Sequence, residues 1–519
     1  MSVSISQSPA NSGSSGLSAF IGDSARHLTI FTIVLLLLLY GYEIFNFSLS
    51  IDEELVGSGY EGNWWRLAIS QGRWGMGLLG RIFPPLGPIP MISTVLFCAG
   101  LGLSGCILAR VLFRNPSAQF AFVGIFVSSP LWPHLAEFNI TSWCMGIACV
   151  LLTWALLLFL ADRRLNDIWV ACVLAFATGI YESFFVWFLV LLCIHHLSVL
   201  LEMAPVAATE QRQRFPWLRS LLVAGGGLLG YFLVRRLLLM VLSLQLTYVQ
   251  GFVRLDEFTT APAAAFARTF WRSWFLLNGG DHIFLGYGPV LTALPLLGLL
   301  ILVIRLLWRG PLKTSQRLLA GAILVAGLMF ALSPLVVSAG TIPSRALISL
   351  VPLSAFLGSV ALSFSGRFRK PLYCVLAVAL FISIWVSVSL FYTDHLARQR
   401  DEFLAARIMT RVDNILPNPP PGRIPFVVVG AVPAKAAGPF RKLDIFGDSF
   451  FDASHEGGNP WRVAAYLQLL GVDTLEPHLI TEIARYRQVV ETMPVWPASG
   501  SVAMVNGMLV IKLGPLPPA

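Results

Sequence analysis

The sequence predicts an all-α polytopic membrane protein that ends in a small α/β domain outside the membrane. Hydrophobic residues make up 56% of the 519 residues and charged residues only 12%, about half the charged share of a soluble domain. Apolar runs of about twenty residues, the length that crosses the hydrocarbon core of a bilayer, recur between residues 28 and 392. These runs stop near residue 393, where polar and turn-forming residues become common. The chain therefore divides into a spanning region and a terminal domain.

The first span is predicted at residues 28–49. Residues 1–27 before it are rich in Ser, Gly and Asn, and we expect a disordered cytoplasmic segment. No small-residue cleavage site follows the run, so we expect a retained helix rather than a signal peptide. In all, about eleven spans are predicted. They lie at roughly 28–49, 89–112, 118–136, 141–161, 166–181, 184–203, 218–240, 288–307, 317–338, 346–364 and 371–392.

The seventh run differs from the others because it contains two adjacent charges, Arg235 and Arg236. A charge near the bilayer centre is unfavourable. A seventh span that ends before this pair, with a short interfacial helix after it, fits the sequence. Both interpretations give the same number of membrane crossings, so the predicted sides of the later loops do not change.

Basic residues in the short loops predict the orientation. The net charge of +9 comes mainly from Arg residues at the ends of apolar runs, a pattern typical of topology-determining loops rather than of nucleic-acid binding. One side of the predicted membrane carries Arg110, Arg114, Arg163, Arg164, Arg212, Arg214, Arg219, Arg305, Arg309, Lys313, Arg317, Arg367, Arg369 and Lys370. The short loops opposite offer only Arg345. By the positive-inside rule the Arg-rich side and the N-terminus are cytoplasmic, and the C-terminal domain lies outside.

Two longer external segments interrupt the spanning region 28–392, at residues 50–88 and 246–287. The first is expected to contain a short helix along the membrane surface, since Trp64, Trp65 and Trp74 give it an aromatic side. The second is charged and contains Arg254, Asp256, Glu257, Arg268, Arg272, Asp281 and His282.

The terminal domain, residues 393–519, is predicted to mix helices with strands. Its expected elements are an amphipathic helix at 394–416, a stiff proline break at 417–421, a strand at 424–429, helices at 461–470 and 479–491, and a hairpin at 502–512 turning at Asn506-Gly507. The sequence shows no internal repeat.

Cysteine usage argues against disulfides and against a cysteine metal site. All seven cysteines lie in apolar runs, and no C-x-x-C pair occurs. The cysteines are Cys98, Cys106, Cys144, Cys149, Cys172, Cys193 and Cys374. Neither a zinc signature nor a Gly-rich phosphate loop is present.

Three consecutive acids, Asp52-Glu53-Glu54, follow the first span and mark the candidate site. A single acid there would be typical of a solvated helix end. Three together, with Glu61 and a Trp- and Arg-rich segment nearby, favour a functional site. A carboxylate at the mouth of a membrane cavity can act as general base on an acceptor hydroxyl, a contribution of about 10²–10⁴ in rate.

Arg66, Arg73 and Arg345 are the candidate phosphate ligands. Guanidinium groups bind phosphate bidentately and neutralise the charge that develops on a phosphate leaving group. Snorkelling from an interfacial helix is the alternative explanation for Arg66 and Arg73. For the aromatic residues Trp64, Trp65 and Trp74, stacking on a sugar or a prenyl chain is expected.

Other polar residues are less specific. His134, Glu137 and Glu182 lie at external span ends, where each either lines the same cavity or is simply a solvated helix end. In the terminal domain, Asp444, Asp448 and Asp452 are expected to belong to a solvated loop.

An external site has no access to cytoplasmic nucleotide sugars or ATP. A transferase at this position must therefore use a donor that has already crossed in the lipid phase. An acidic base beside a basic phosphate clamp suits a polyprenyl-phosphate sugar as donor, with a polysaccharide or a lipid-linked glycan as acceptor.

At this point the chain resembles the integral-membrane glycosyltransferases of the C-type (GT-C) fold, and more narrowly the Gtr-type bacterial glucosyltransferases that decorate O-antigen. The likeness extends over most of the chain from about residue 28. It rests on Asp52-Glu53, Trp64, Gly72-Arg73-Trp74, Gly179-Ile180-Tyr181-Glu182, Phe446-Gly447-Asp448-Ser449 and the stretch from Gly457 to Arg462.

The resemblance implies transfer of glucose from undecaprenyl-phosphate glucose to a surface polysaccharide, such as the O-antigen of lipopolysaccharide, at the periplasmic face of the bacterial inner membrane. It also implies an acidic base in the first external loop and inversion at the anomeric carbon. The family more often has two Asp residues there, so either Asp52 or Glu53 is the base in this chain. We favour Asp52, with Glu53 orienting the acceptor. No metal or other cofactor is predicted, although acids at this position hold a divalent ion in related enzymes.

Two alternatives remain. A transporter or flippase for lipid-linked sugars would place charges within spans and show repeated halves, whereas here the polar residues gather at one face. A polysaccharide polymerase or ligase would concentrate Arg and His in one large external loop, and Arg254, Arg268, Arg272 and His282 of segment 246–287 fit that pattern.

Overall fold

The computed structural model describes residues 23–516 apart from 60–62, 84–90, 162–163, 206–216, 248, 309–311, 365, 419–420, 434–442, 453–457 and 479–486. The expectation of disorder for the N-terminal segment falls almost wholly outside these residues, as does most of the predicted helix at 479–491 and part of the predicted proline break at 417–421.

The prediction of a mostly helical membrane protein is confirmed. Among the described residues, eight helices are long and apolar enough to cross a membrane. They are α1 (Asp23–Phe45), α5 (Ile92–Leu112), α8 (Asn139–Leu160), α10 (Ser183–Leu200), α12 (Trp217–Val241), α15 (Gly288–Leu307), α16 (Thr314–Val337) and α18 (Arg369–Ile415). Three shorter apolar helices, α6 (Pro116–Val127), α9 (Arg164–Ile180) and α17 (Leu350–Phe364), occupy the other predicted spans. For these three, crossing of the membrane stays a prediction.

The seventh predicted span does not end before its two arginines. Arg235 and Arg236 both lie inside the continuous helix α12. The Arg235 guanidinium lies 4.7 Å from the centre of the Phe232 ring and 5.3 Å from that of Tyr231. Aromatic faces attract cations, so these rings offset part of the unfavourable transfer of the charge.

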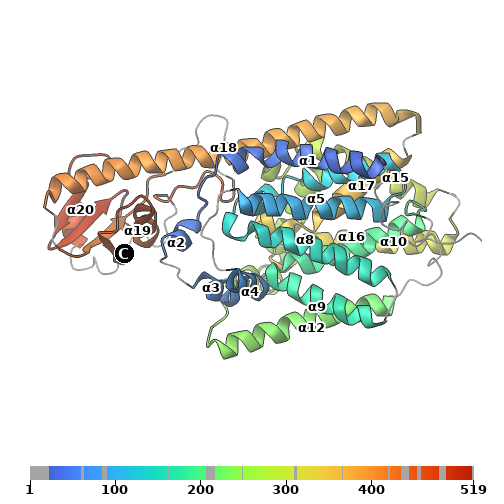
Figure 1. Cartoon of the computed structure of the whole chain (residues 1–519), viewed down its shortest axis with the longest axis horizontal. Helices are drawn as coiled ribbons and strands as arrows, with labels where there is room; N and C mark the ends of the chain where they lie inside the picture. The colour runs from blue at the N-terminus through green and yellow to red at the C-terminus, as the bar shows by residue number, and fades with distance from the viewer. Residues whose placement is uncertain are drawn as a thin grey trace, which may run out of the picture.

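Helix α18 joins the spanning bundle to the terminal sheet. The structure has one helix of 47 residues where the sequence suggested a span and a separate amphipathic helix. At a rise of about 1.5 Å per residue, this helix is about 70 Å long, more than twice the hydrocarbon thickness. Figure 1 shows it running along the whole bundle and on to the sheet.

The sheet has four strands in the order β2-β1-β4-β3. Strand β1 (Ile424–Val429) pairs parallel with β2 (Leu475–Pro477) on one side and with β4 (Met508–Lys512) on the other, while β3 (Val502–Val505) pairs antiparallel with β4. The predicted hairpin is confirmed. Asn506 and Gly507 both have positive φ, 49° and 86°, as a tight hairpin turn requires. Helices α19 (Pro460–Leu469) and α20 (Arg487–Thr492) complete this part.

The described residues also form a set of further helices, most of them short. They are α2 (Glu53–Gly57), α3 (Trp64–Ser70), α4 (Trp74–Ile82), α7 (Pro133–Ala136), η1 (Val249–Phe252), α13 (Glu257–Thr260), α14 (Pro262–Asn278), η2 (His282–Phe284) and η3 (Ser344–Leu347), while η4 (Gly366–Phe368) precedes α18. In Figure 1, α2 lies between the sheet and the bundle, with α3 and α4 below it.

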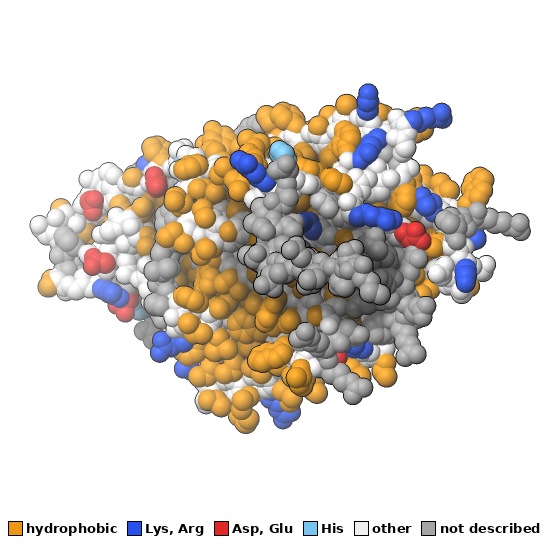
Figure 2. All heavy atoms as spheres, turned by 45° about the vertical axis from the view of Figure 1, so that its right-hand side comes forward, with side chains coloured by type: hydrophobic (Ala, Val, Ile, Leu, Met, Phe, Trp, Pro, Cys, Tyr) orange, Lys and Arg blue, Asp and Glu red, His pale blue; other side chains and the backbone are white. Residues whose placement is uncertain are grey.

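The surface of the molecule also differs between the spanning region and the sheet-bearing end. Figure 2 shows a broad hydrophobic area in the middle of the molecule, as expected for a lipid-facing belt. Most of the Lys and Arg side chains visible in this view lie to its right, and most of the visible acidic side chains lie at the left-hand, sheet-bearing end.

Candidate active site

Two cavities lie at the end of the bundle that faces the sheet. The first has a volume of about 270 Å³, and its lining includes Asp52, Glu53 and Trp64. The second has a volume of about 260 Å³, and its lining includes Glu182, Ser183 and Phe252. Arg73, Tyr181 and Arg345 line both. The two cavities therefore meet at a pair of arginines.

Asp52 stands at the mouth of the first cavity. Its backbone is in the left-handed region, with φ of 80°, directly before α2. Only a few per cent of non-glycine residues adopt this conformation, and it needs support from its surroundings. That support comes from Arg462, whose Nη2 donates to Asp52 Oδ1 over 2.7 Å. The side chain is 66% exposed, so the carboxylate is accessible to a substrate.

Glu53 differs sharply from its neighbour, because it is only 2% exposed. Its Oε1 accepts from the Ile140 backbone N–H at 2.9 Å and its Oε2 from the Ser50 N–H at 3.0 Å. Burial raises the pKa of Glu53 from 4.5 to about 8, even though both hydrogen bonds lower it. Glu53 therefore attaches the loop to the start of α8 and is mostly protonated at neutral pH.

Replacing Glu53 by Gln is expected to flatten the pH dependence of stability. The folded-state pKa of about 8 lies above the unfolded value of 4.5, so the stabilising contribution of the protonated acid is complete below pH 4.5 and is lost as the pH rises through 8. Glu53→Gln cannot ionise, but its single amide oxygen satisfies only one of the two backbone donors, at a cost of about 1–3 kcal/mol.

Thermal unfolding in detergent at pH 5 and pH 8.5 checks this. The wild-type midpoint should fall more between the two pH values than that of the variant. Equal falls in both proteins would contradict the argument. A smaller fall should persist in the variant, because burial also raises the pKa of Glu54, to about 7, and the pKa of Glu137.

More acids lie buried behind this loop than the sequence indicated. Glu137 was expected either to line the cavity or to be a solvated helix end, yet it is fully buried at the end of α7 and lines neither cavity. Burial raises the pKa of Glu137 well above its usual value, and the nearby Asp394 and Glu43 carboxyls raise it further. The Asn139 amide donates to Glu43 Oε1 at 3.3 Å. Acids from α1, α2, α7 and α18 thus pack together, a grouping that no local pattern in the sequence reveals.

Arg73 is held at the cavity junction by close helix packing. It precedes α4, and its guanidinium lies 5.1 Å from the centre of the Tyr181 ring and 3.8 Å from Glu182 Oε2. Trp74 packs against α9, where a Cβ added to Gly179 would lie 2.5 Å from the indole Cε2. Glycine at this position therefore lets α4 approach α9 and places Arg73 between Tyr181 and Glu182.

Arg345 projects from η3 to the same junction. Its Nη1 donates to Asp444 Oδ1 at 2.6 Å. The prediction that Asp444 belongs to a solvated loop is wrong, because this side chain is only 17% exposed. His134 Nδ1 lies 3.8 Å from the other Asp444 oxygen. Burial lowers the pKa of His134 to about 4, so the imidazole is neutral and Arg345 is the cation that Asp444 pairs with.

The other predicted site residues divide into two groups. Trp64 lines the first cavity and Glu182 the second. The Trp64 ring lies against α4, where a Cβ on Gly80 would come within 2.1 Å of the indole Cζ2. Arg66, Trp65 and Trp74 line neither cavity.

Each of these three has a structural partner instead. Arg66 Nη2 donates to the Leu242 carbonyl at 2.9 Å, and its guanidinium lies 5.8 Å from the Trp65 ring centre. Trp74 is buried 5.8 Å from the Phe176 ring.

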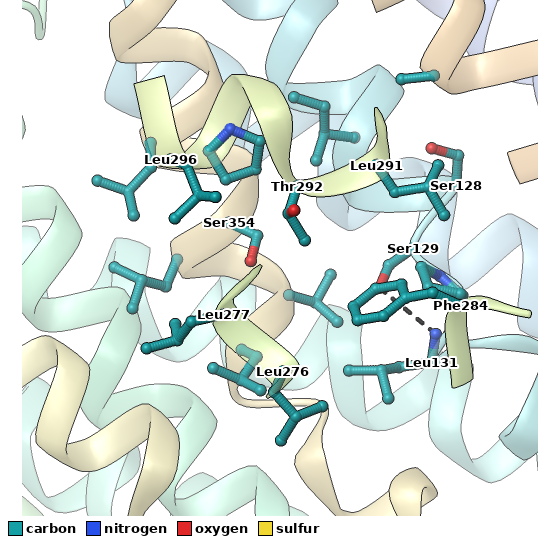
Figure 3. Close-up of a pocket in the computed structure, with 18 of the residues that line it drawn as sticks. Ser128, Ser129, Leu131, Leu276, Leu277, Phe284, Leu291, Thr292, Leu296 and Ser354 are labelled. Atoms are coloured by element: carbon teal, nitrogen blue, oxygen red, sulfur yellow. Dashed lines mark hydrogen bonds between the residues drawn. The ribbon is translucent and has the colours of Figure 1, made fainter. Parts of the chain in front are cut away.

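A third cavity, of about 100 Å³, lies among the spanning helices. Figure 3 shows Leu276, Leu277, Leu291 and Leu296 around it, with the hydroxyls of Thr292 and Ser354 as polar groups. No described charged side chain lines this cavity, so it offers no acid–base chemistry. Among the described residues, no group of three or more His, Cys, Asp or Glu side chains is arranged to hold a metal ion.

The fold and the cavities define an integral-membrane protein of many helices, with acids and arginines converging at the end of its bundle. The family model described as Glucosyl transferase GtrII matches residues 41–362. The chain belongs to this family and is a glycosyltransferase. No curated protein and no solved structure matches it. The matched region contains Asp52, Arg73 and Arg345 but ends before Asp444 and Arg462.

Proposed function

We propose that the protein transfers a hexose, specifically glucose, from a polyprenyl phosphate to a surface polysaccharide such as O-antigen. The observation that carries the proposal is the junction of the two cavities, where an accessible carboxylate faces the same space as two guanidinium groups. A base for the acceptor and cations for the phosphate are what this reaction needs. The family match supports glucosyl transfer.

In the proposed reaction, the acceptor glycan occupies the first cavity and the donor the second. Asp52 takes the proton of the acceptor hydroxyl as its oxygen forms a bond to the anomeric carbon. The bond from that carbon to the phosphate oxygen breaks, and its electron pair leaves on the polyprenyl phosphate. Arg73 and Arg345 neutralise the charge that develops on this leaving group. Attack from the side opposite the phosphate inverts the anomeric centre.

The surrounding residues support these roles. The Trp64 indole N–H is buried in the lining of the first cavity and has no hydrogen-bond partner among the described residues, so it is available to a sugar hydroxyl. Glu182 lines the second cavity, and its ion pair with Arg73 orients the guanidinium. In this scheme Glu53 holds the base loop rather than the acceptor itself, since backbone donors occupy both of its oxygens. Arg66, Trp65 and Trp74 take structural rather than substrate-binding roles.

The proposed location is the bacterial inner membrane, with a GT-C-like arrangement of spans. Residues 1–27 lie in the cytoplasm, residues 28–392 form the transferase region, and residues 393–519 form a periplasmic domain. The Arg-rich short loops at one end of the bundle support this orientation. A donor in the outer leaflet then reaches the second cavity from the side, next to the apolar Phe252 and Val337.

The structure argues against a polymerase or ligase built on segment 246–287. Arg254 and Arg268 both bind Glu257, and Arg272 donates to the Gly340 and Ile342 carbonyls. None of these three arginines lines either cavity at the junction. These contacts hold the segment in place, partly within itself and partly on the loop that follows α16.

Transfer in proteoliposomes tests the proposal. Purified protein receives radiolabelled polyprenyl-phosphate glucose together with lipopolysaccharide, and label in the polysaccharide is measured. We expect protein-dependent transfer without added nucleotide sugar. If donor lipid exchanges between leaflets in a protein-dependent way and no label is transferred, the protein is a flippase and the acids form a gate.

A further inference from the structure

Arg462 belongs to the sheet-bearing part of the chain, outside the family-matched region. It lies in the first turn of α19, where the Asn459 side chain accepts from the Arg462 backbone N–H at 3.0 Å. The next residue, Val463, packs in the same hydrophobic core as Phe426 of strand β1. Arg462 is therefore attached to a rigid element, and it is only 6% exposed.

The Arg462 guanidinium reaches back to the acids of the first loop. Nη2 donates to Asp52 Oδ1 over 2.7 Å, and Nη1 pairs with Glu54 Oε1, whose residue is fully buried. The planar fork of arginine can bind two carboxylates in a fixed geometry, which a lysine ammonium cannot do. One buried cation thus fixes two of the three consecutive acids.

We propose that Arg462 is a positioning residue for catalysis: the C-terminal part completes the active site by fixing the Asp52 carboxylate at the mouth of the first cavity. This inference rests on the proposed role of Asp52 as general base. It assigns a function in transfer to a segment that the family match does not cover.

The physical argument concerns the orientation of the base. Asp52 is mostly exposed, so without Arg462 its side chain would exchange between staggered rotamers. The ion pair occupies Oδ1 and leaves Oδ2 with no hydrogen bond from any other described residue. That oxygen is the one available to an acceptor hydroxyl. Misplacing a reacting group by about 1 Å can lower the rate about 10²-fold.

The test compares Arg462→Ala with Arg411→Ala in the transfer assay. Arg411 of α18 is a matched control, because it also joins two segments of the C-terminal part, donating to the Pro497 and Ala498 carbonyls and to Ser501 Oγ. It lines neither cavity. We expect Arg462→Ala to lower kcat about 10–10²-fold while KM for the donor changes less than about twofold.

Rescue separates positioning from folding. Millimolar guanidinium should restore part of kcat in Arg462→Ala and should have no effect on Arg411→Ala, and Arg462→Lys should recover less than guanidinium does. Loss of kcat without rescue, in a variant as thermally stable as Arg411→Ala, would overturn the inference. So would unchanged kcat in Arg462→Ala when Asp52→Asn is inactive, and that result would leave the proposed function standing. Full activity of Asp52→Asn would instead remove the proposed function itself.

Discussion

Asp52→Asn is expected to lower kcat for glucosyl transfer by about 10²–10⁴-fold while leaving KM for the donor nearly unchanged. The amide has the size of the carboxylate and keeps one oxygen to accept from Arg462, so the loop should keep its conformation. The variant loses the ability to take a proton and the charge of the ion pair with Arg462, but it keeps the hydrogen bond. A fall in kcat without a change in KM is the signature of an interaction made in the transition state. Initial rates over a range of donor concentrations measure both constants.

Glu53→Gln is the matched control for this experiment, because it removes a carboxyl group one residue away. Glu53 is buried and both of its oxygens accept from backbone N–H groups, so the variant should lose stability rather than the base. We expect a smaller fall in kcat than in Asp52→Asn. The reverse order, with Glu53→Gln inactive and Asp52→Asn active, would assign the base to Glu53.

Hydropathy predicted the spanning helices well because each of them must bury or expose a long apolar surface. Hydropathy gave the wrong helix end at α18, because it reports the surroundings of a residue and not the conformation of its backbone. The change from apolar to polar residues at Asp394 marks a change of surroundings, whereas the backbone continues as one helix from Arg369 to Ile415. A hydropathy boundary was therefore interpreted as a helix boundary.

The candidate site was predictable only in part. The sequence placed Asp52, Arg73 and Arg345 on one side of the membrane, and the structure brings all three to the lining of one cavity. The predicted membrane topology was enough to place these three residues together. The roles of Asp444 and Arg462 could not be predicted, because their partners Arg345 and Asp52 lie 99 and 410 residues away in the sequence.

Tryptophan placement shows a second limit. Sequence reasoning treated Trp64, Trp65 and Trp74 alike, yet only Trp64 lines a cavity. The position of the Trp64 and Trp74 rings depends on the glycine that each ring packs against. Gly179 lets the Trp74 ring pack onto α9, away from the substrate space. Pairing a tryptophan with a glycine about a hundred residues later requires three-dimensional contacts.

Arg345→Gln is expected to lower kcat/KM for the donor by about 10²–10³-fold, the usual effect of removing one group that stabilises developing charge. The guanidinium lines both cavities and is the counterion of Asp444. Its loss removes a phosphate ligand and leaves a half-buried carboxylate without its cation. Both consequences disfavour an anionic donor at the junction. Transfer rates at low donor concentration measure the effect.

Asp444 makes the prediction for Arg345 more specific. The Asp444 carboxylate accepts from Arg345 Nη1 at 2.6 Å, so donor phosphate must compete with it. Asp444→Asn should therefore lower KM for the donor, whereas Arg345→Gln raises it. In the double variant, the neutral Asn removes the uncompensated charge and recovers only the repulsive part of the loss. A double variant as active as wild type would show that Arg345 acts only as the counterion of Asp444. A double variant less active than Arg345→Gln would show that Asp444 itself binds the substrate.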